Sequence, residues 1–151
     1  DLDKKISGEK EKAEFTGEKL RGRQYLSGLS IEDLEKYGRY LQWNFFALTE
    51  LEQPLWLKAK HSFALPEEYR VKEIEKAAFY EFSKAIAVIE KELDSKEFLL
   101  GDNFYACDLL VGSVLNWARG FDFLDESYPN SFDYITRLTK REAFLKLKDS
   151  K

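Results

Sequence analysis

Apolar residues over much of this chain recur with the spacing of a single helix face. Between residues 31 and 55, and again between 71 and 93, they return at intervals of three, four and seven. This rhythm is typical of amphipathic helices that bury one side. The positions are Ile31, Leu34, Tyr37, Leu41, Phe45, Leu48, Leu51 and Leu55 in the first segment, and Val71, Ile74, Ala78, Phe82, Ala85, Ile86, Ile89 and Leu93 in the second.

Capping residues and prolines indicate where these two helices begin and break. Ser30 is the expected N-cap of the first helix, with Asp33 three residues further on. Pro54 has no N–H to donate and crowds the preceding turn, so we expect the first helix to bend there. Pro66, followed by Glu67 and Glu68, predicts that the second helix begins near residue 66.

A third helix is predicted from residue 106 to about 119, with Gly120 as the residue that ends it. The segment 109–118 carries almost no charge, and a helix that is apolar on nearly all sides belongs in the middle of a bundle. Two shorter helices are expected after Pro129 and from about 142 to 148, with Phe132, Ile135, Leu138, Phe144 and Leu147 facing inward. No alternating strand pattern is present, so the predicted class is an all-α helical bundle.

Composition limits the kinds of partner and compartment. The 151 residues carry a net charge of −4 with both signs interspersed, which disfavours nucleic acid and membranes as partners. One cysteine fits a reducing, cytoplasmic location. The chain starts at Asp1 and contains no Met, so we expect a piece of a longer protein, with residues 1–28 as a lead-in and 29–148 as one helical domain.

The segment 98–110, FLLGDNFYACDLL, carries the most specific local signal. Gly101 and Asp102 supply turn chemistry, and Tyr105 stands at the N-cap of the third helix. Asp108 lies three residues later, where its carboxylate can reach back to unpaired backbone N–H groups. Phe104 and Leu109 occupy the positions of a hydrophobic staple. We therefore interpret Asp108 as a structural capping carboxylate.

This motif resembles the buried helix start in the C-terminal domain of the glutathione S-transferase family, bacterial type. Four further stretches are similar to that family in the same order: TELEQPLW at 49–56, HSF at 61–63, PEE at 66–68, and the tail YPNSFDYITRLTKREAF at 128–144. The resemblance covers about Leu29 to Leu147. The chain departs from the family pattern at Tyr105 in place of Ser or Thr, at Cys107 in place of Ala, and at Glu142 in place of Pro.

The resemblance implies a two-domain protein of which this chain holds the second half. The family's thioredoxin-like N-terminal domain, absent from this sequence, binds most of the co-substrate glutathione and activates its thiol. The full-length protein is then expected to be a dimeric glutathione transferase that conjugates small hydrophobic electrophiles, whereas the chain alone is expected to be inactive. The residues agree: no group here combines thiol activation with recognition of a tripeptide's charged ends, and we assign no catalytic residue.

The helical domain of this family supplies the wall for the electrophile, and the first helix offers candidates for it. Phe45, Thr49, Glu52 and Trp56 are spaced at i, i+4, i+7 and i+11, so they share one face. Apolar bodies with few polar groups suit a binding wall. Trp117 is the candidate for its far side. The alternative reading is ordinary inter-helix packing for the first four and a core role for Trp117.

Two other residues, Cys107 and His61, have side chains that could take part in chemistry but have plainer readings, and a second function stays open. Cys107 is in a helix's first turn, yet its apolar neighbours indicate an inert core thiol. His61 is the only histidine, so we expect a solvated helix-end residue and no metal site. A fold of this kind also serves in non-catalytic interaction or assembly modules. A thioredoxin-like half encoded upstream would favour the enzyme over the module.

Overall fold

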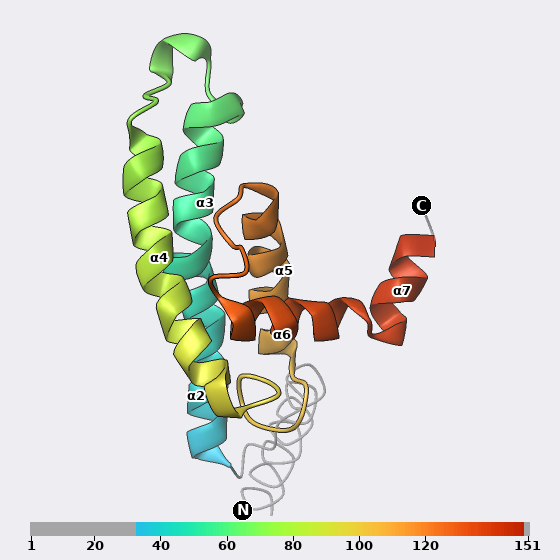
Figure 1. The fold of residues 1–151 in the computed structure, drawn as a ribbon. Helices are drawn as coiled ribbons and strands as arrows, with labels where there is room; N and C mark the ends of the chain where they lie inside the picture. Colours follow the sequence, from blue (N-terminus) through green and yellow to red (C-terminus); the bar gives the residue numbers. More distant parts are fainter. Residues whose placement is uncertain (1–32, 150–151) are drawn as a thin grey trace, which may run out of the picture.

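The computed structural model describes residues 33–149, with side chains up to residue 146. Its longest feature is a helical rod made of α2 (Leu34–Phe46), a π turn (Ala47–Leu51), α3 (Glu52–Ala59) and a second π turn (Lys60–Ala64). Figure 1 shows α4 (Ile74–Glu92) running back beside this rod as the second arm of a hairpin.

The rod begins at Asp33. Its Oδ1 accepts from the Lys36 N–H at 3.0 Å, and its backbone is not helical, so Asp33 is the N-cap and Leu34 the first helical residue. The prediction that Asp33 sits inside the first turn was wrong, because its short carboxylate serves as the cap itself. Ser30 and the predicted lead-in 1–28 lie outside the described residues.

The rod changes its winding one turn before Pro54. In the π turn Ala47–Leu51, backbone bonds reach one residue further than in an α-helix, as in the Glu52 N–H to the Ala47 carbonyl. A proline leaves the carbonyl four residues before it without a partner and crowds it. The π turn contains Glu50, whose carbonyl is the one four residues before Pro54. The helix continues past Pro54, which is buried. The sequence located the irregularity but not its form.

The tip of the hairpin is tied by Arg70 and His61. The Arg70 side chain donates to the carbonyls of Leu65 at 2.7 Å and Phe63 at 3.0 Å, which have no further helical partner. His61 Nδ1 accepts from the Val71 N–H at 3.1 Å. These contacts hold the chain extended between the two arms.

The second arm therefore begins at Ile74. The sequence had predicted a start near residue 66, which was wrong. Residues Glu67–Tyr69 form only a 3-10 turn, and Arg70 is extended. Val71, expected on the buried stripe, is 48% exposed because it lies before the helix. From Ala78 onward the predicted stripe is confirmed, with Phe82, Ile86 and Ile89 fully buried.

The remaining helices are α5 (Ala106–Gly120), α6 (Pro129–Thr139) and α7 (Glu142–Asp149). Helix α5 packs against the rod and α6, whereas α7 extends from the far end of α6 (Figure 1). Residues 33–149 contain no strand, only one isolated bridge between Phe98 and Gly101. The all-α prediction is confirmed. The core also holds Leu51, Leu55, Leu99, Val111, Leu115, Tyr134 and Ile135, all almost completely buried.

Asp108 is the polar centre of this core. Its Oδ1 accepts from the Leu99 N–H at 2.9 Å, and its Oδ2 accepts from the Tyr105 N–H at 2.8 Å. Tyr134, from α6, donates its hydroxyl to Oδ1 at 2.8 Å. The carboxylate thus joins the turn before α5, the start of α5 itself and the buried face of α6.

Burial disfavours the charged form of Asp108, whereas its hydrogen bonds favour that form. Removal from water raises the pKa of this carboxyl, while the three donors pull it back. The same burial, with the carboxylate beside it, holds the Tyr134 pKa well above its usual range. A buried ion needs every one of its partners, so the three segments are held in one arrangement.

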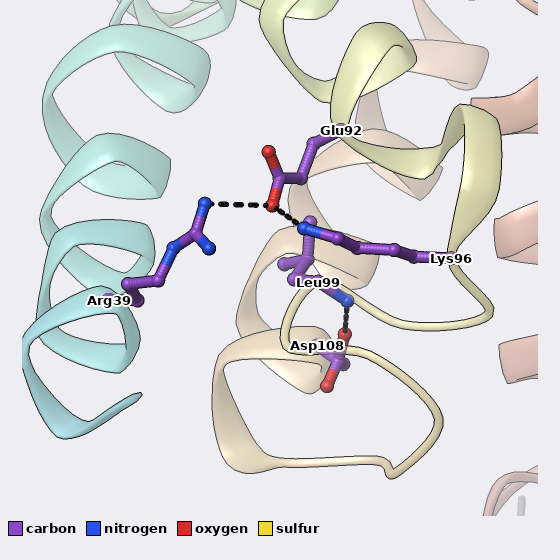
Figure 2. A network of polar contacts seen from close by, with 5 residues as sticks. All are labelled: Arg39, Glu92, Lys96, Leu99 and Asp108. Carbon is purple, nitrogen blue, oxygen red and sulfur yellow. Dashed lines mark hydrogen bonds and ion pairs between the residues drawn. The ribbon is translucent and has the colours of Figure 1, made fainter. Parts of the chain in front are cut away.

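A second polar network fastens the outside of the same turn. Figure 2 shows the Glu92 carboxylate between Arg39 of α2 and Lys96 of the following loop, close to the Leu99–Asp108 bond. The Arg39 contact measures 3.4 Å and is half exposed. Such a pair adds little energy by itself, and its effect is to hold the loop near α2.

Glu90 caps α6 from a different helix. Its two carboxylate oxygens accept from the Asn130 N–H at 2.8 Å and from the Ser131 N–H at 2.9 Å. The Ser131 hydroxyl adds a third bond at 2.7 Å. A carboxylate at a helix N-terminus is favoured by the unpaired N–H groups and by the helix dipole. The contact fixes where α6 starts relative to α4.

The end of α5 differs from the expected glycine stop. Gly120 is still helical, and the left-handed residue is Asp122, at φ 59°. The Phe123 N–H donates to the Ala118 carbonyl at 3.0 Å and the Asp122 N–H to the Arg119 carbonyl at 3.2 Å. This is the bonding of a Schellman motif, with an aspartate where glycine is usual.

Replacing Asp122 with glycine should stabilise the protein by about 0.5–1 kcal/mol, because glycine adopts positive φ without strain and removes a negative charge from a helix C-terminus. Asp122→Asn is the control, since it removes only the charge and should gain a few tenths of a kcal/mol, about a third of the glycine effect. Urea unfolding measures both. A loss of stability in Asp122→Gly would contradict this account.

Asp108→Asn should lower the free energy of unfolding by about 2–3 kcal/mol, because the amide has one acceptor oxygen and turns its NH₂ group toward a backbone donor. Asp102→Asn, at an exposed aspartate of the same turn, should stay within about 0.5 kcal/mol of the parent. Equal effects of the two substitutions in thermal or urea unfolding would show that the cap is not what holds the turn.

Cys107 should be almost unreactive in the folded protein. Burial and the adjacent Asp108 charge raise its pKa to about 12. At pH 8 the thiolate fraction is then on the order of 10⁻⁴, far below that of a free thiol. Labelling with a disulfide reagent at pH 8 should be at least about 100-fold slower than in urea-unfolded protein. Labelling at the unfolded rate without denaturant would contradict this.

Candidate functional site

Three of the five predicted wall residues meet on one surface of the molecule. Trp56, in α3, donates its indole N–H to Glu52 Oε1 at 3.1 Å, one helical turn earlier. Its ring meets Trp117 of α5 edge to face, with 5.2 Å between ring centres. Trp56 is 46% exposed. We call Glu52, Trp56 and Trp117 the tryptophan wall.

Aromatic rings continue from the tryptophan wall along the end of α5. Trp117 packs on Phe121 at 5.6 Å, and Phe121 lies 6.4 Å from Phe63. Phe123 lies 6.5 Å from Phe121 and joins Phe79 of α4 at 5.3 Å. Phe63 and Phe79 are largely exposed. The molecule therefore carries a connected aromatic strip, of which Trp56 and Trp117 are one end.

Lys58 lies over two rings in the middle of this strip, Phe121 and Phe123. Its Nζ donates to Glu75 at 2.6 Å and to the Phe121 carbonyl at 3.2 Å. The same ammonium lies 4.7 Å from the centre of the Phe123 ring and 5.4 Å from that of Phe121. With all these partners, Lys58 is best understood as a tie between α3, α4 and the C-terminus of α5.

The other two predicted wall residues lie elsewhere on the rod. Thr49 turns its hydroxyl back to the Phe45 carbonyl at 3.0 Å and lines a hollow of about 550 Å³ between the rod and α4. Phe45 is 65% exposed. Between Phe45 and Glu52 the π turn adds residues to one turn, which shifts the later side chains by up to about 100° relative to a regular α-helix. The predicted common face assumed regular winding.

Glu52 gives the tryptophan wall its charge. The ion pairs found among the described residues join Arg39 and Lys96 to Glu92, Lys58 to Glu75, and Lys146 to Glu142. None of them involves Glu52. One oxygen of its carboxylate accepts from Trp56, and the residue is partly exposed. The wall therefore presents two indole rings beside a carboxylate.

No metal-binding cluster accompanies these rings in the part of the chain that is described. Cys107 is fully buried, and His61 uses Nδ1 to accept from Val71. Residues 33–149 hold no group of three His, Cys, Asp or Glu side chains placed to bind a metal. What the described surface can do is bind and orient an aromatic or apolar molecule.

Hollows lie elsewhere on the described surface, and one of about 590 Å³ lies beside the aromatic strip at Phe79, Phe121 and Phe123. One of about 410 Å³ at the hairpin tip includes His61 and Arg70, which already have partners. An apolar one of about 250 Å³ lies between α5, α6 and α7 and includes Phe104, Leu109 and Phe144. Phe104 and Leu109, the predicted staple, thus line the same hollow, while Phe104 packs edge to face on Phe98 at 5.9 Å.

Sequence reasoning missed several residues that position the site. Tyr134 and Glu90 bond to partners far away in the chain, at Asp108 and at the start of α6. Lys58 resembles any exposed lysine in a charged run. Only Arg70 gave a usable signal, because a basic residue shortly after a helix end often binds the last carbonyls.

Solved structures with a similar fold include glutathione transferases. The glutathione transferase URE2P6 from Phanerochaete chrysosporium, in complex with oxidized glutathione, superposes with a TM-score of 0.67 and 22% identity over 76% of this chain and 53% of its own. Gtt2 from Saccharomyces cerevisiae gives 0.63 and 22%, over 73% and 55%. BphK, a bacterial glutathione transferase in a ternary complex, gives 0.64 and 23%, over 88% and 62%.

The chain spans a little over half the length of these proteins. No curated protein sequence shows a significant match. No helix within residues 33–149 has both the length and the apolar character needed to cross a bilayer. Residues 53–142, more than half of the sequence, match the family described as glutathione S-transferase, C-terminal domain. The chain therefore belongs to the glutathione S-transferase C-terminal domain family.

Proposed function

We propose that this chain is the acceptor-binding half of a glutathione transferase and that its tryptophan wall receives the electrophile. The observation that carries the proposal is the Trp56–Trp117 pair, held in place by Glu52 and left partly open to solvent. Exposed indoles fixed by a hydrogen bond offer a large apolar contact at small entropic cost. Phe45 and Thr49, which lie elsewhere on the rod, are not part of this wall.

Glutathione enters this proposal as a co-substrate held mainly by a thioredoxin-like domain outside the sequence. The similar structures from Phanerochaete chrysosporium and Methylobacillus flagellatus contain oxidized glutathione and glutathione, respectively. The residues of the present chain supply the acceptor side and exclude water around it, while thiol activation belongs to the other domain. The complete protein is then a cytoplasmic homodimer.

A second candidate is a non-catalytic interaction module. It is favoured by exposed apolar residues along α2 and the π turn after it, namely Leu34, Leu41, Phe45 and Leu48. Exposed residues of this kind suit a partner helix or domain. In the enzyme, a partner domain would cover them and leave the tryptophan wall free, whereas in the module they would be the working surface.

The full-length gene product should conjugate glutathione to an aromatic electrophile, and Trp56→Ala should raise the KM for that electrophile by about five- to tenfold through lost ring contact. The KM for glutathione should change less than about twofold. Steady-state kinetics with each substrate varied in turn measure both constants.

Tyr80→Ala is the matched control, since Tyr80 is an exposed aromatic residue of α4 on which no part of the proposal depends. It should leave both KM values at the parental level. If the full-length product is not retained on immobilised glutathione and does not conjugate glutathione to the electrophile, the interaction module is favoured. If the product is active and Trp56→Ala leaves its KM for the electrophile unchanged, the electrophile binds elsewhere.

A further inference from the structure

We propose that Glu52 makes the tryptophan wall selective by charge, so that it accepts neutral and cationic aromatic molecules and rejects anionic ones. This inference rests on the proposed function, because it names the class of electrophile for the same surface. It makes Glu52 a specificity-determining residue and not a catalytic one.

The carboxylate is fixed beside the rings and does not swing freely. The Trp56 N–H donates to Glu52 Oε1 at 3.1 Å, so the charge stays within hydrogen-bond distance of the indole. Trp117 packs edge to face with the Trp56 ring, with 5.2 Å between the ring centres. A molecule stacked on the open part of Trp56 would therefore lie a few ångströms from a negative charge whose position is set by the wall.

No described cation lies within ion-pair distance of Glu52. Lys58, the nearest basic side chain along α3, pairs with Glu75 and lies over the Phe121 and Phe123 rings. The ion pairs of the described residues leave Glu52 out. At a separation of about 4 Å, even in water, like charges weaken binding about fivefold, and partial burial increases the effect.

The ring faces add to the same preference. The π-faces of tryptophan are negative, and tryptophan attracts cations more strongly than the other aromatic side chains do. A ligand with a carboxylate or sulfonate would meet both the ring faces and Glu52 unfavourably. An aromatic ligand with an ammonium group would gain from both, and a neutral one would keep only the apolar and ring contacts. The expected order is cationic, then neutral, then anionic.

The test uses three ligands with one ring system: 2-naphthylmethanol, 2-naphthoate and (2-naphthylmethyl)trimethylammonium. Each is titrated into the 151-residue chain at pH 7 and followed by NMR through the indole N–H signals. The chain has three tryptophans, and the signal of buried Trp43 is the internal control. Trp56→Phe and Trp117→Phe assign the other two.

The parent should bind 2-naphthoate at least about fivefold more weakly than 2-naphthylmethanol, with shifts at Trp56 and Trp117 and not at Trp43. Glu52→Gln retains an oxygen that accepts from Trp56 but removes the charge, and it should bring the two affinities within about twofold. Glu50→Gln, a charge removal one residue before the end of the π turn, should leave the parental ratio unchanged.

Two results would overturn the inference in different ways. Equal affinities for the three ligands in the parent, or a ratio that Glu52→Gln leaves unchanged, would refute selection by charge and leave the tryptophan wall standing. If no ligand, titrated up to its own solubility limit, shifts the Trp56 signal, then the tryptophan wall itself is refuted, and the proposed function with it.

Discussion

The structure depends on one buried carboxylate shared by three parts of the chain. Asp108 receives N–H bonds from Leu99 and Tyr105 and a hydroxyl bond from Tyr134. An ion without water needs all its donors, so the turn before α5, the start of α5 and the face of α6 take fixed relative positions. Trp117 lies nine residues, about 14 Å, further along α5, and its place against Trp56 is set by this anchor.

The second constraint is Pro54 in the middle of a helix. A missing N–H and a crowded carbonyl would normally kink the rod, and here the π turn Ala47–Leu51 precedes it. The wider turn rotates Glu52 and Trp56 toward α5, away from Thr49, which lines the hollow beside α4. The composition of the wall therefore follows from how the backbone accommodates a proline.

The local parts of this arrangement were predictable from sequence and the distant parts were not. The bond from the Tyr105 N–H to Asp108 joins residues three apart, which is the spacing that capping rules cover. The third partner of Asp108, Tyr134, lies 26 residues away, and no spacing rule reaches it. The start of α4 was misplaced because Arg70 binds the end of the preceding helix, and the stop of α5 because an aspartate adopts the left-handed conformation. The proposed grouping of five wall residues assumed uniform winding.

The tryptophan wall combines one local and one distant contact, and this separates its charge from its shape. Glu52 and Trp56 are one turn apart in α3, so their bond needs only that helix. The Trp56–Trp117 contact needs α5 in place, and hence the Asp108 anchor. Substitutions that shift α5 would alter which rings a ligand can reach without altering the charge beside Trp56. Ring geometry and charge preference are therefore independently variable properties of this surface.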